Sequence, residues 1–173
     1  MTREPMPTSV QIRPARPEEY AAVGELSATV YVQDGLVEAG SAYLAELAAA
    51  DERAAAAELL VAVDPESDQP VVGSVTFVPF GSRYSEIAGP GEVEIRMLVV
   101  AARARGRGLG EALVRATLER ANTLGATRMR LSTQASMVGA HPIYRRLGFT
   151  RTPDRDWSPS PGVDLLTYVR SLT

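Results

Sequence analysis

The amino-acid sequence predicts a mixed α/β fold of three layers, in which helices flank a central β-sheet. Strand-like apolar runs and segments of helical period follow one another in the order β-α-α-β-β-β-α-β-α-β-β, which is typical of a mixed sheet layered with helices. The chain has 173 residues and 45% hydrophobic content, which suits one domain with a full core. We expect residues 1–9 to form a disordered tail and residues 10–173 to form that single domain.

The first half of the domain is predicted to hold a strand, two helices and a hairpin. Val10–Arg13 alternates as a short strand does. Pro17–Tyr31 predicts a helix, because proline and two glutamates occupy its first turn. A second helix is expected over roughly Ser41–Ala50. Two apolar strands, Leu59–Val63 and Pro70–Phe80, are separated by turn residues and therefore predict a β-hairpin.

The second half is predicted to begin with the central strand of the sheet, Glu92–Val100. A helix then covers about Leu109–Leu124, with Gly125 as its C-terminal cap. The remaining elements are a strand at Thr127–Thr133, a short helix at about Val138–Leu147 closed by Gly148, strand-like residues 149–152, a loop over Pro153–Pro161 and a last strand at about Val163–Val169.

The turn between the central strand and the helix that follows it, Arg105–Gly110, indicates an anion site. A strand, a glycine turn and a helix in that order leave backbone N–H groups unpaired and pointing one way, with the positive end of the helix dipole behind them. Three arginines (Arg103, Arg105 and Arg107) add positive charge where an anion would lie. The spacing is neither that of a P-loop nor that of a dinucleotide-binding fold. Such turns also occur as plain connections, so the glycines alone leave both interpretations open.

The central strand changes its pattern along its length. Glu92, Glu94 and Arg96 share one face in the first part, and the residues between them share the other. From Leu98 to Val100 both faces are apolar. This change is compatible with a bulge that frees backbone groups for a ligand, and equally with continuous burial in the middle of a sheet.

Composition excludes several classes of site. The chain has no cysteine, which rules out disulfides and thiolate nucleophiles, and its single histidine, His141, rules out a histidine-rich metal site, so no metal is expected. A net charge of −3 provides no basic surface for nucleic acid. Neither a signal peptide nor a run able to span a bilayer is evident, so no membrane association and a cytoplasmic location are expected.

Three stretches together resemble the GNAT superfamily of acyl-CoA-dependent N-acyltransferases. They are the strand end Leu98–Val100, the turn Arg105–Gly110, and the segment Ala140–Phe149 with Tyr144 inside the form Ala-x-x-x-Tyr-x-x-x-Gly-Phe. The element order also matches, so the resemblance covers about residues 10–170. It implies a splayed, mixed central sheet of six to seven strands flanked by about four helices.

The resemblance also implies a cosubstrate, acetyl-CoA, and the residues that hold it. Leu98 and Val100 would offer backbone groups to the pantetheine arm, Gly106–Glu111 would bind the pyrophosphate through N–H groups, and Tyr144 would protonate the departing thiolate. The full set of implied cofactor-binding residues is Leu98, Val99, Val100, Arg105, Gly106, Arg107, Gly108, Leu109, Gly110 and Glu111. Many members carry Asn seven residues before that tyrosine. Here the position holds Met137, beside Ser136.

An amine acceptor requires a base, because an alkylammonium at neutral pH costs about 4–5 kcal/mol to deprotonate. Glu94 lies six residues before Val100, the spacing at which the histone-acetyltransferase branch of the family places its glutamate base. Glu92, or a water, is the alternative. The thiolate needs less help, since its thiol pKa is about 8.5. No covalent nucleophile is required, so direct attack by the amine on the thioester is expected.

The acceptor is expected to be a primary amine of unspecified kind. The variable elements that would recognise it contain Tyr31, Asp34, Glu38, Tyr43, Tyr84 and Glu86. Trp157 either walls the acceptor site or covers the core. Two other functions stay open: a catalytically idle acyl-CoA-binding sensor or regulatory module, and a scaffold that keeps only the fold. The chain could also form a homodimer.

Overall fold

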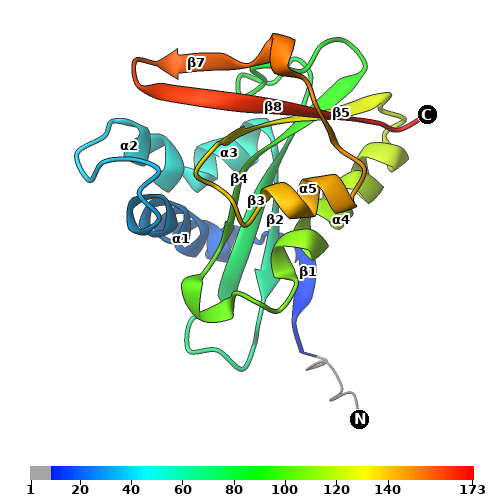
Figure 1. Ribbon diagram of the computed structural model, residues 1–173. Helices are drawn as coiled ribbons and strands as arrows, with labels where there is room; N and C mark the ends of the chain where they lie inside the picture. Colours follow the sequence, from blue (N-terminus) through cyan, green and yellow to red (C-terminus); the bar gives the residue numbers. More distant parts are fainter. Residues whose placement is uncertain (1–8) are drawn as a thin grey trace, which may run out of the picture.

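The computed structural model describes residues 9–173 and contains one mixed β-sheet. The predicted tail, residues 1–9, falls almost wholly outside the described residues. The strands are β1 (Gln11–Pro14), β2 (Glu58–Val63), β3 (Val71–Pro79), β4 (Glu92–Val100), β5 (Arg128–Gln134), β6 (Thr150–Arg151), β7 (Trp157–Ser160) and β8 (Val163–Ser171). Their order in the sheet is β1-β2-β3-β4-β5-β8-β6, and β7 pairs with β8 (Figure 1).

Five α-helices lie on the two faces of the sheet in the described part of the chain. They are α1 (Tyr20–Gln33), α2 (Tyr43–Ala48), α3 (Ala50–Ala56), α4 (Leu109–Thr123) and α5 (His141–Arg146). Single 3₁₀ turns cover Pro17–Glu19, Ala102–Ala104 and Pro153–Arg155. Figure 1 shows α1, α2 and α3 together on one side of the sheet and α4 and α5 on the other. The predicted fold class is therefore confirmed.

The core has two parts, one on each face. On one face, Leu113 and Leu118 of α4 pack with Phe77 and Ile95 of the sheet. On the other, α1, α2 and α3 cover two smaller apolar clusters, of which Met97 and Val99 of β4 belong to one. The sheet is thus buried on both sides, as a three-layer domain requires.

The counts of elements differ from those expected, for local reasons. The sheet has eight strands rather than six or seven, because β7 forms inside the predicted loop Pro153–Pro161 and pairs with β8. The predicted helix Ser41–Ala50 is divided at Ala49, whose backbone leaves the helical region at φ −82 and ψ 58. The buried guanidinium of Arg53 caps the end of α2, where its Nη1 donates to the carbonyls of Glu46 (2.6 Å) and Leu47 (2.8 Å).

The central strand β4 contains a bulge and separates from β5 half-way along. The hairpin of β2 and β3 is antiparallel as predicted, and β3 continues the sheet to β4, but the register shifts between Ser74 and Thr76. Opposite that shift, Met97 has φ 55, which an L-residue rarely adopts. The parallel pairing of β4 with β5 covers only residues 92–95 of β4. The structure therefore contains the bulge that the sequence left open.

The bulge changes which face the later side chains occupy. Ile95 packs on the α4 side, and so do Leu98 and Val100, three and five residues later. Met97 and Val99 pack on the α1 side. Both faces of this stretch are apolar because helices cover the sheet on both sides. The stretch is therefore both buried and bulged. Among residues 9–173, no helix is long and apolar enough to cross a membrane.

Candidate active site

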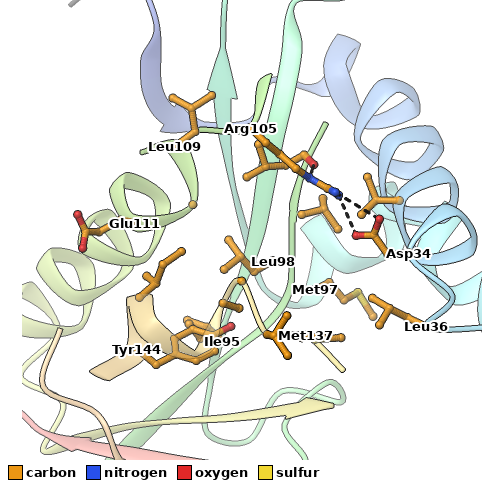
Figure 2. A pocket seen from close by; sticks show the side chains of 18 of the residues that line it. Asp34, Leu36, Ile95, Met97, Leu98, Arg105, Leu109, Glu111, Met137 and Tyr144 are labelled. Atoms are coloured by element: carbon orange, nitrogen blue, oxygen red, sulfur yellow. Dashed lines mark hydrogen bonds and ion pairs between the residues drawn. The ribbon is translucent and has the colours of Figure 1, made fainter. Parts of the chain in front are cut away.

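A cleft of about 740 Å³ opens where β4 and β5 separate. Five segments line it: the end of α1 with the residues just after it, β4 from Ile95 onward, the turn leading into α4, β5 at Leu131 and Ser132, and the segment from Ser136 to Arg146 (Figure 2). The turn, the strand end and Tyr144, which the sequence predicted separately, therefore meet in one place.

The turn into α4 presents a row of free backbone donors. Gly106 and Gly108 have φ 80 and 76, a region that residues with a Cβ rarely occupy. The first backbone N–H of this helix to find an acceptor is that of Ala112, which donates to the carbonyl of Gly108 at 3.0 Å. The six N–H groups from Gly106 to Glu111 donate to no acceptor among residues 9–173. Together with the helix dipole, they form a site for an anion.

The three arginines near this turn do not concentrate their charge on it, contrary to the sequence-based expectation. Arg103 donates to the carbonyl of Gln69 at 2.8 Å, and Arg107 pairs with Asp64 at 2.9 Å and holds the pKa of that carboxyl below its usual range. Neither lines the cleft. Arg105 does, but it pairs with Asp34 at 2.8 Å. The partners lie 34 to 71 residues away in sequence, so only the tertiary structure shows them.

The end of β4 turns backbone groups toward the cleft. Ala101 donates to the carbonyl of Val72 at 2.8 Å, so these two residues form a hydrogen-bonded pair of the antiparallel ladder. The next pair, Gly73 with Val100, is then a non-hydrogen-bonded one, and the amide and carbonyl of Val100 point away from β3. Leu98, two residues earlier, shares this orientation, whereas Val99 faces β3 and packs its side chain in the α1-side core.

Tyr144 brings a phenol into the cleft from α5. Its side chain is 5% exposed and packs against the rings of Phe149 and Tyr168, at centroid distances of 5.9 Å and 5.8 Å. The chain reverses after α5 at Gly148, and the N–H of Phe149 donates to the carbonyl of Tyr144 at 3.0 Å. Burial raises the pKa of the Tyr144 phenol. The phenol therefore stays protonated and can donate.

The two glutamates of β4 do not line the cleft with Tyr144. Oε1 of Glu94 accepts hydrogen bonds from the N–H groups of Glu86 (2.6 Å), Ile87 (3.2 Å) and Ala88 (3.4 Å), and thereby anchors the loop between β3 and β4. Its Oε2 is bound by no donor among residues 9–173. The side chain as a whole is 2% exposed.

The carboxylate of Glu92 has charged partners as well as a backbone donor, unlike that of Glu94. Its carboxylate accepts from Arg130 at 2.8 Å and from the N–H of Gly89 at 2.8 Å, and Arg128 lies 3.6 Å away. Burial opposes ionisation here, but the hydrogen bonds from Arg130 and Gly89 prevail and lower the pKa of Glu92. A paired carboxylate with a lowered pKa is a weak base, so Glu92 is the poorer of the two candidates.

Sequence reasoning did not give a role to Arg96, which lines both the cleft and a smaller hollow of about 430 Å³ beside it. Its Nη2 lies 3.0 Å from Glu86 and 3.6 Å from Glu46, and its Nη1 donates to the carbonyl of Tyr84. Burial raises the pKa of Glu86, although Arg96 opposes the shift. The only signal in the sequence was the alternation that places Arg96 on one face with Glu94.

The residues expected to recognise an acceptor divide between these two hollows. Tyr31 and Asp34 line the cleft, and Tyr84 and Glu86 line the smaller hollow. Tyr43 lines neither hollow, but its hydroxyl accepts a hydrogen bond at 3.4 Å from Nη2 of Arg96, which lines both. Glu38 lines neither.

The loop before α5 and the strand β7 complete the surroundings. Ser136 and Met137 line the cleft, and the sulfur of Met137 accepts from the hydroxyl of Thr133 at 3.2 Å. Trp157 does not line the cleft itself. Its indole N–H donates to the hydroxyl of Ser132, a lining residue, at 3.0 Å. His141 lies outside the cleft and contacts the carbonyl of Gln134. Within residues 9–173, no group of three or more His, Cys, Asp or Glu side chains could hold a metal ion.

Comparisons with known proteins agree with this geometry. The family model described as Acetyltransferase (GNAT) family matches residues 25–149. N-acetyltransferase 8B of Rattus norvegicus is 34% identical over 87 residues, which are 50% of this chain and 38% of that protein. An uncharacterized N-acetyltransferase of Schizosaccharomyces pombe is 32% identical over 112 residues, which are 65% of this chain and 61% of that protein. The chain thus spans less than two thirds of the length of these relatives.

Solved structures show the same fold. A GNAT-family acetyltransferase of Staphylococcus aureus has a TM-score of 0.75 at 14% identity, covering 95% of this chain and 100% of that one. An acetyltransferase of Salmonella typhimurium has a TM-score of 0.71 at 21% identity, covering 96% of this chain and 95% of that one. At these identities the likeness concerns the fold alone. The family match over most of the domain establishes the conclusion: this chain belongs to the acetyltransferase (GNAT) family.

Proposed function

We propose that the protein is an N-acetyltransferase that transfers the acetyl group of acetyl-CoA to a primary amine by direct attack within a ternary complex. One observation carries the proposal: five of the six residues with free N–H groups at the start of α4, Gly106 and Gly108–Glu111, line a cleft together with a buried phenol, Tyr144. The names of the related proteins support it. The Salmonella typhimurium structure is described with its cofactor acetyl-CoA, and a further neighbour of 20% identity is a NatC complex bound to a Gag peptide and CoA.

The residues of the cleft fit such a cosubstrate. The N–H groups of Gly106–Glu111 would bind the diphosphate, which carries the charge that a helix N-terminus favours. The backbone of Leu98 and Val100, turned away from β3, would bind the amides of the pantetheine arm. The pantetheine arm would then run along the edge of β4 and bring the thioester toward Tyr144.

The chemistry then divides between the acceptor and two side chains. Acetyl-CoA supplies an acetyl group activated as a thioester. The amine nitrogen forms the new C–N bond as the C–S bond breaks, and the phenol of Tyr144 donates its proton to the sulfur. The proton that the nitrogen loses as it becomes an amide then restores the phenol. We propose that the amine loses its proton through a water to Glu94, since Oε2 of that carboxylate is bound by no described donor. Relief of the deprotonation cost of about 4–5 kcal/mol is the task of that base.

The test is CoA release, measured as free thiol, from the protein with acetyl-CoA and a library of primary amines. Turnover with one class of amine would support the proposal. A second function, a CoA-binding module without catalysis, is favoured by two observations: Met137 where many members carry Asn, and the loop-anchoring bonds of Glu94. Binding of acetyl-CoA without turnover across the library would favour that module. A scaffold that keeps only the fold predicts no thermal shift with acetyl-CoA.

A further inference from the structure

One ion pair crosses the cleft between its two walls. The guanidinium of Arg105, in the turn before α4, meets the carboxylate of Asp34 at the end of α1, with Nη2–Oδ2 at 2.8 Å and Nη1–Oδ1 at 3.3 Å. Both residues line the cleft, and Figure 2 shows their side chains reaching toward each other from opposite sides. We call Asp34 and Arg105 the cross-cleft pair.

Arg105 also donates a hydrogen bond from its Nε to a backbone carbonyl on the edge of β4. Its Nε donates to the carbonyl of Val100 at 3.2 Å. This is the carbonyl that points into the cleft, on the edge where the pantetheine arm is expected to bind. In the arrangement that the structure describes, Arg105 therefore occupies one of the two lone pairs of an acceptor that a pantetheine amide would use.

The cross-cleft pair is of the kind that a stronger anion can separate. The side chains of Arg105 and Asp34 are 45% and 34% exposed, and partly exposed pairs of this kind contribute little to stability. Arg105 also adjoins Gly106, the first of the six free N–H groups. A diphosphate held there would place two negative charges beside the guanidinium, in competition with a single carboxylate.

Building on the proposed function, we propose that Asp34 is a positioning residue that sets the affinity for the cofactor. Asp34 holds Arg105 across the cleft and on the Val100 carbonyl. When CoA binds, the guanidinium of Arg105 leaves Asp34 and pairs with the phosphate groups. The carbonyl of Val100 is then free to accept a hydrogen bond from the pantetheine arm. Asp34 therefore opposes binding of CoA rather than assisting it, and its charge, not merely its shape, is responsible.

The experiment is calorimetric titration of the full chain with CoA and, separately, with pantetheine, which has no phosphate. We expect Asp34→Asn to lower the Kd for CoA by about three- to fivefold at low salt, the range that a partly exposed ion pair can supply. The gain should shrink as salt is added. The Kd for pantetheine should fall by less than that for CoA, because pantetheine gains only access to the Val100 carbonyl and carries no phosphate that recruits Arg105. Arg105→Gln should raise the Kd for CoA.

Glu38→Gln is the matched control, because it removes one negative charge from the same segment at an exposed residue that pairs with no cation in the described part of the chain. Its Kd for CoA should equal that of the wild type. The inference is wrong if Asp34→Asn, folded as judged by circular dichroism, binds CoA no more tightly than the wild type, or if Glu38→Gln tightens binding equally. A wild-type protein that does not bind CoA would overturn the proposed function as well, which is a distinct result.

Discussion

The backbone N–H of Glu86 donates to the carboxylate of Glu94 over 2.6 Å, and this bond ties the loop after β3 to the middle of β4. The loop carries Tyr84 and Glu86, which surround Arg96 at the junction of the two hollows. Glu94 therefore holds the loop next to the cleft in place, and this structural role is separate from its proposed role as a base.

Two substitutions at Glu94 separate its anchoring role from its proposed role as a base. Glu94→Gln keeps an oxygen that can accept the loop N–H groups but cannot take a proton, so we expect a normal melting temperature and a kcat about 10²-fold lower. Glu94→Ala should lose both properties and also melt earlier. The pH dependence of kcat is the second measurement, because the limb that reports the base should vanish in Glu94→Gln. Unchanged turnover in that variant would leave Glu94 as an anchor only.

Tyr144→Phe removes the proposed acid and keeps the ring. We expect kcat to fall about 10²-fold while the Kd for CoA stays near that of the wild type, because the diphosphate and pantetheine contacts are made elsewhere. Tyr168→Phe is the matched control. Its ring lies 5.8 Å from that of Tyr144 and is 3% exposed, but it does not line the cleft. Equal kinetic losses in the two variants would argue against a proton donated by Tyr144.

The two ends of α4 provide a test of the N–H row. Gly108 and Gly125 have φ 76 and 72, and a Cβ at either would meet nothing within 4 Å. Gly108→Ala and Gly125→Ala should therefore cost a similar amount of stability, about 1 kcal/mol each, since the strain is the same. Only Gly108→Ala should weaken binding of CoA, because only Gly108 lies in the row. Urea unfolding and calorimetry measure the two effects, and weaker CoA binding in both variants would contradict this assignment.

The ion pair of Glu92 with Arg130 should make stability depend on pH. Glu92→Gln leaves a buried guanidinium without its partner, and we expect a loss of about 3 kcal/mol in the free energy of unfolding at pH 7. The folded-state pKa of Glu92 is lowered, so its contribution is present above the unfolded pKa of about 4.3 and is lost as pH falls through the folded value. The difference between variant and wild type should thus shrink below pH 4.

Glu58→Gln serves as the comparison for that measurement. Glu58 pairs with Arg120 at 3.0 Å, but both side chains are 40% exposed. An exposed pair of this kind should contribute less than about 1 kcal/mol. A loss in Glu58→Gln as large as that in Glu92→Gln would show that burial does not distinguish the two pairs.

Much of the fold could be predicted because its signals are local. The strand Glu92–Val100 was predicted with the bounds that the structure has, since its apolar residues and flanking glycines are adjacent in sequence. The helix from Leu109 was predicted for the same reason and ends one residue earlier than expected. The division of α2 from α3 at Ala49 was missed, because alanine favours a helix and the break comes from packing. Strand β7 was missed because its partner β8 supplies the pairing.

The candidate site was predicted less evenly. The positions of Tyr144 and the glycine turn in one cleft agree with the expectation, and their roles stay proposals. The expected role of the three arginines depended on where their side chains point, and Arg107 points to Asp64 instead. The same holds for Glu94, whose loop partners lie only six to eight residues away but were not marked by any pattern.

By itself, the sequence determined the order of the elements apart from the division of α2 from α3 and strand β7. It also indicated the glycine turn with its free N–H groups and, through three short stretches, the family, because each of these follows from neighbouring residues and backbone sterics. Only the tertiary structure decided how the charges are shared: which carboxylate holds Arg105, which donors bind Glu94, and how the bulge at Met97 distributes β4 between two cores. The physical reason is that an ion pair or a hydrogen bond depends on distance in space. Asp34 and Arg105, 71 residues apart, become neighbours only once the sheet has formed.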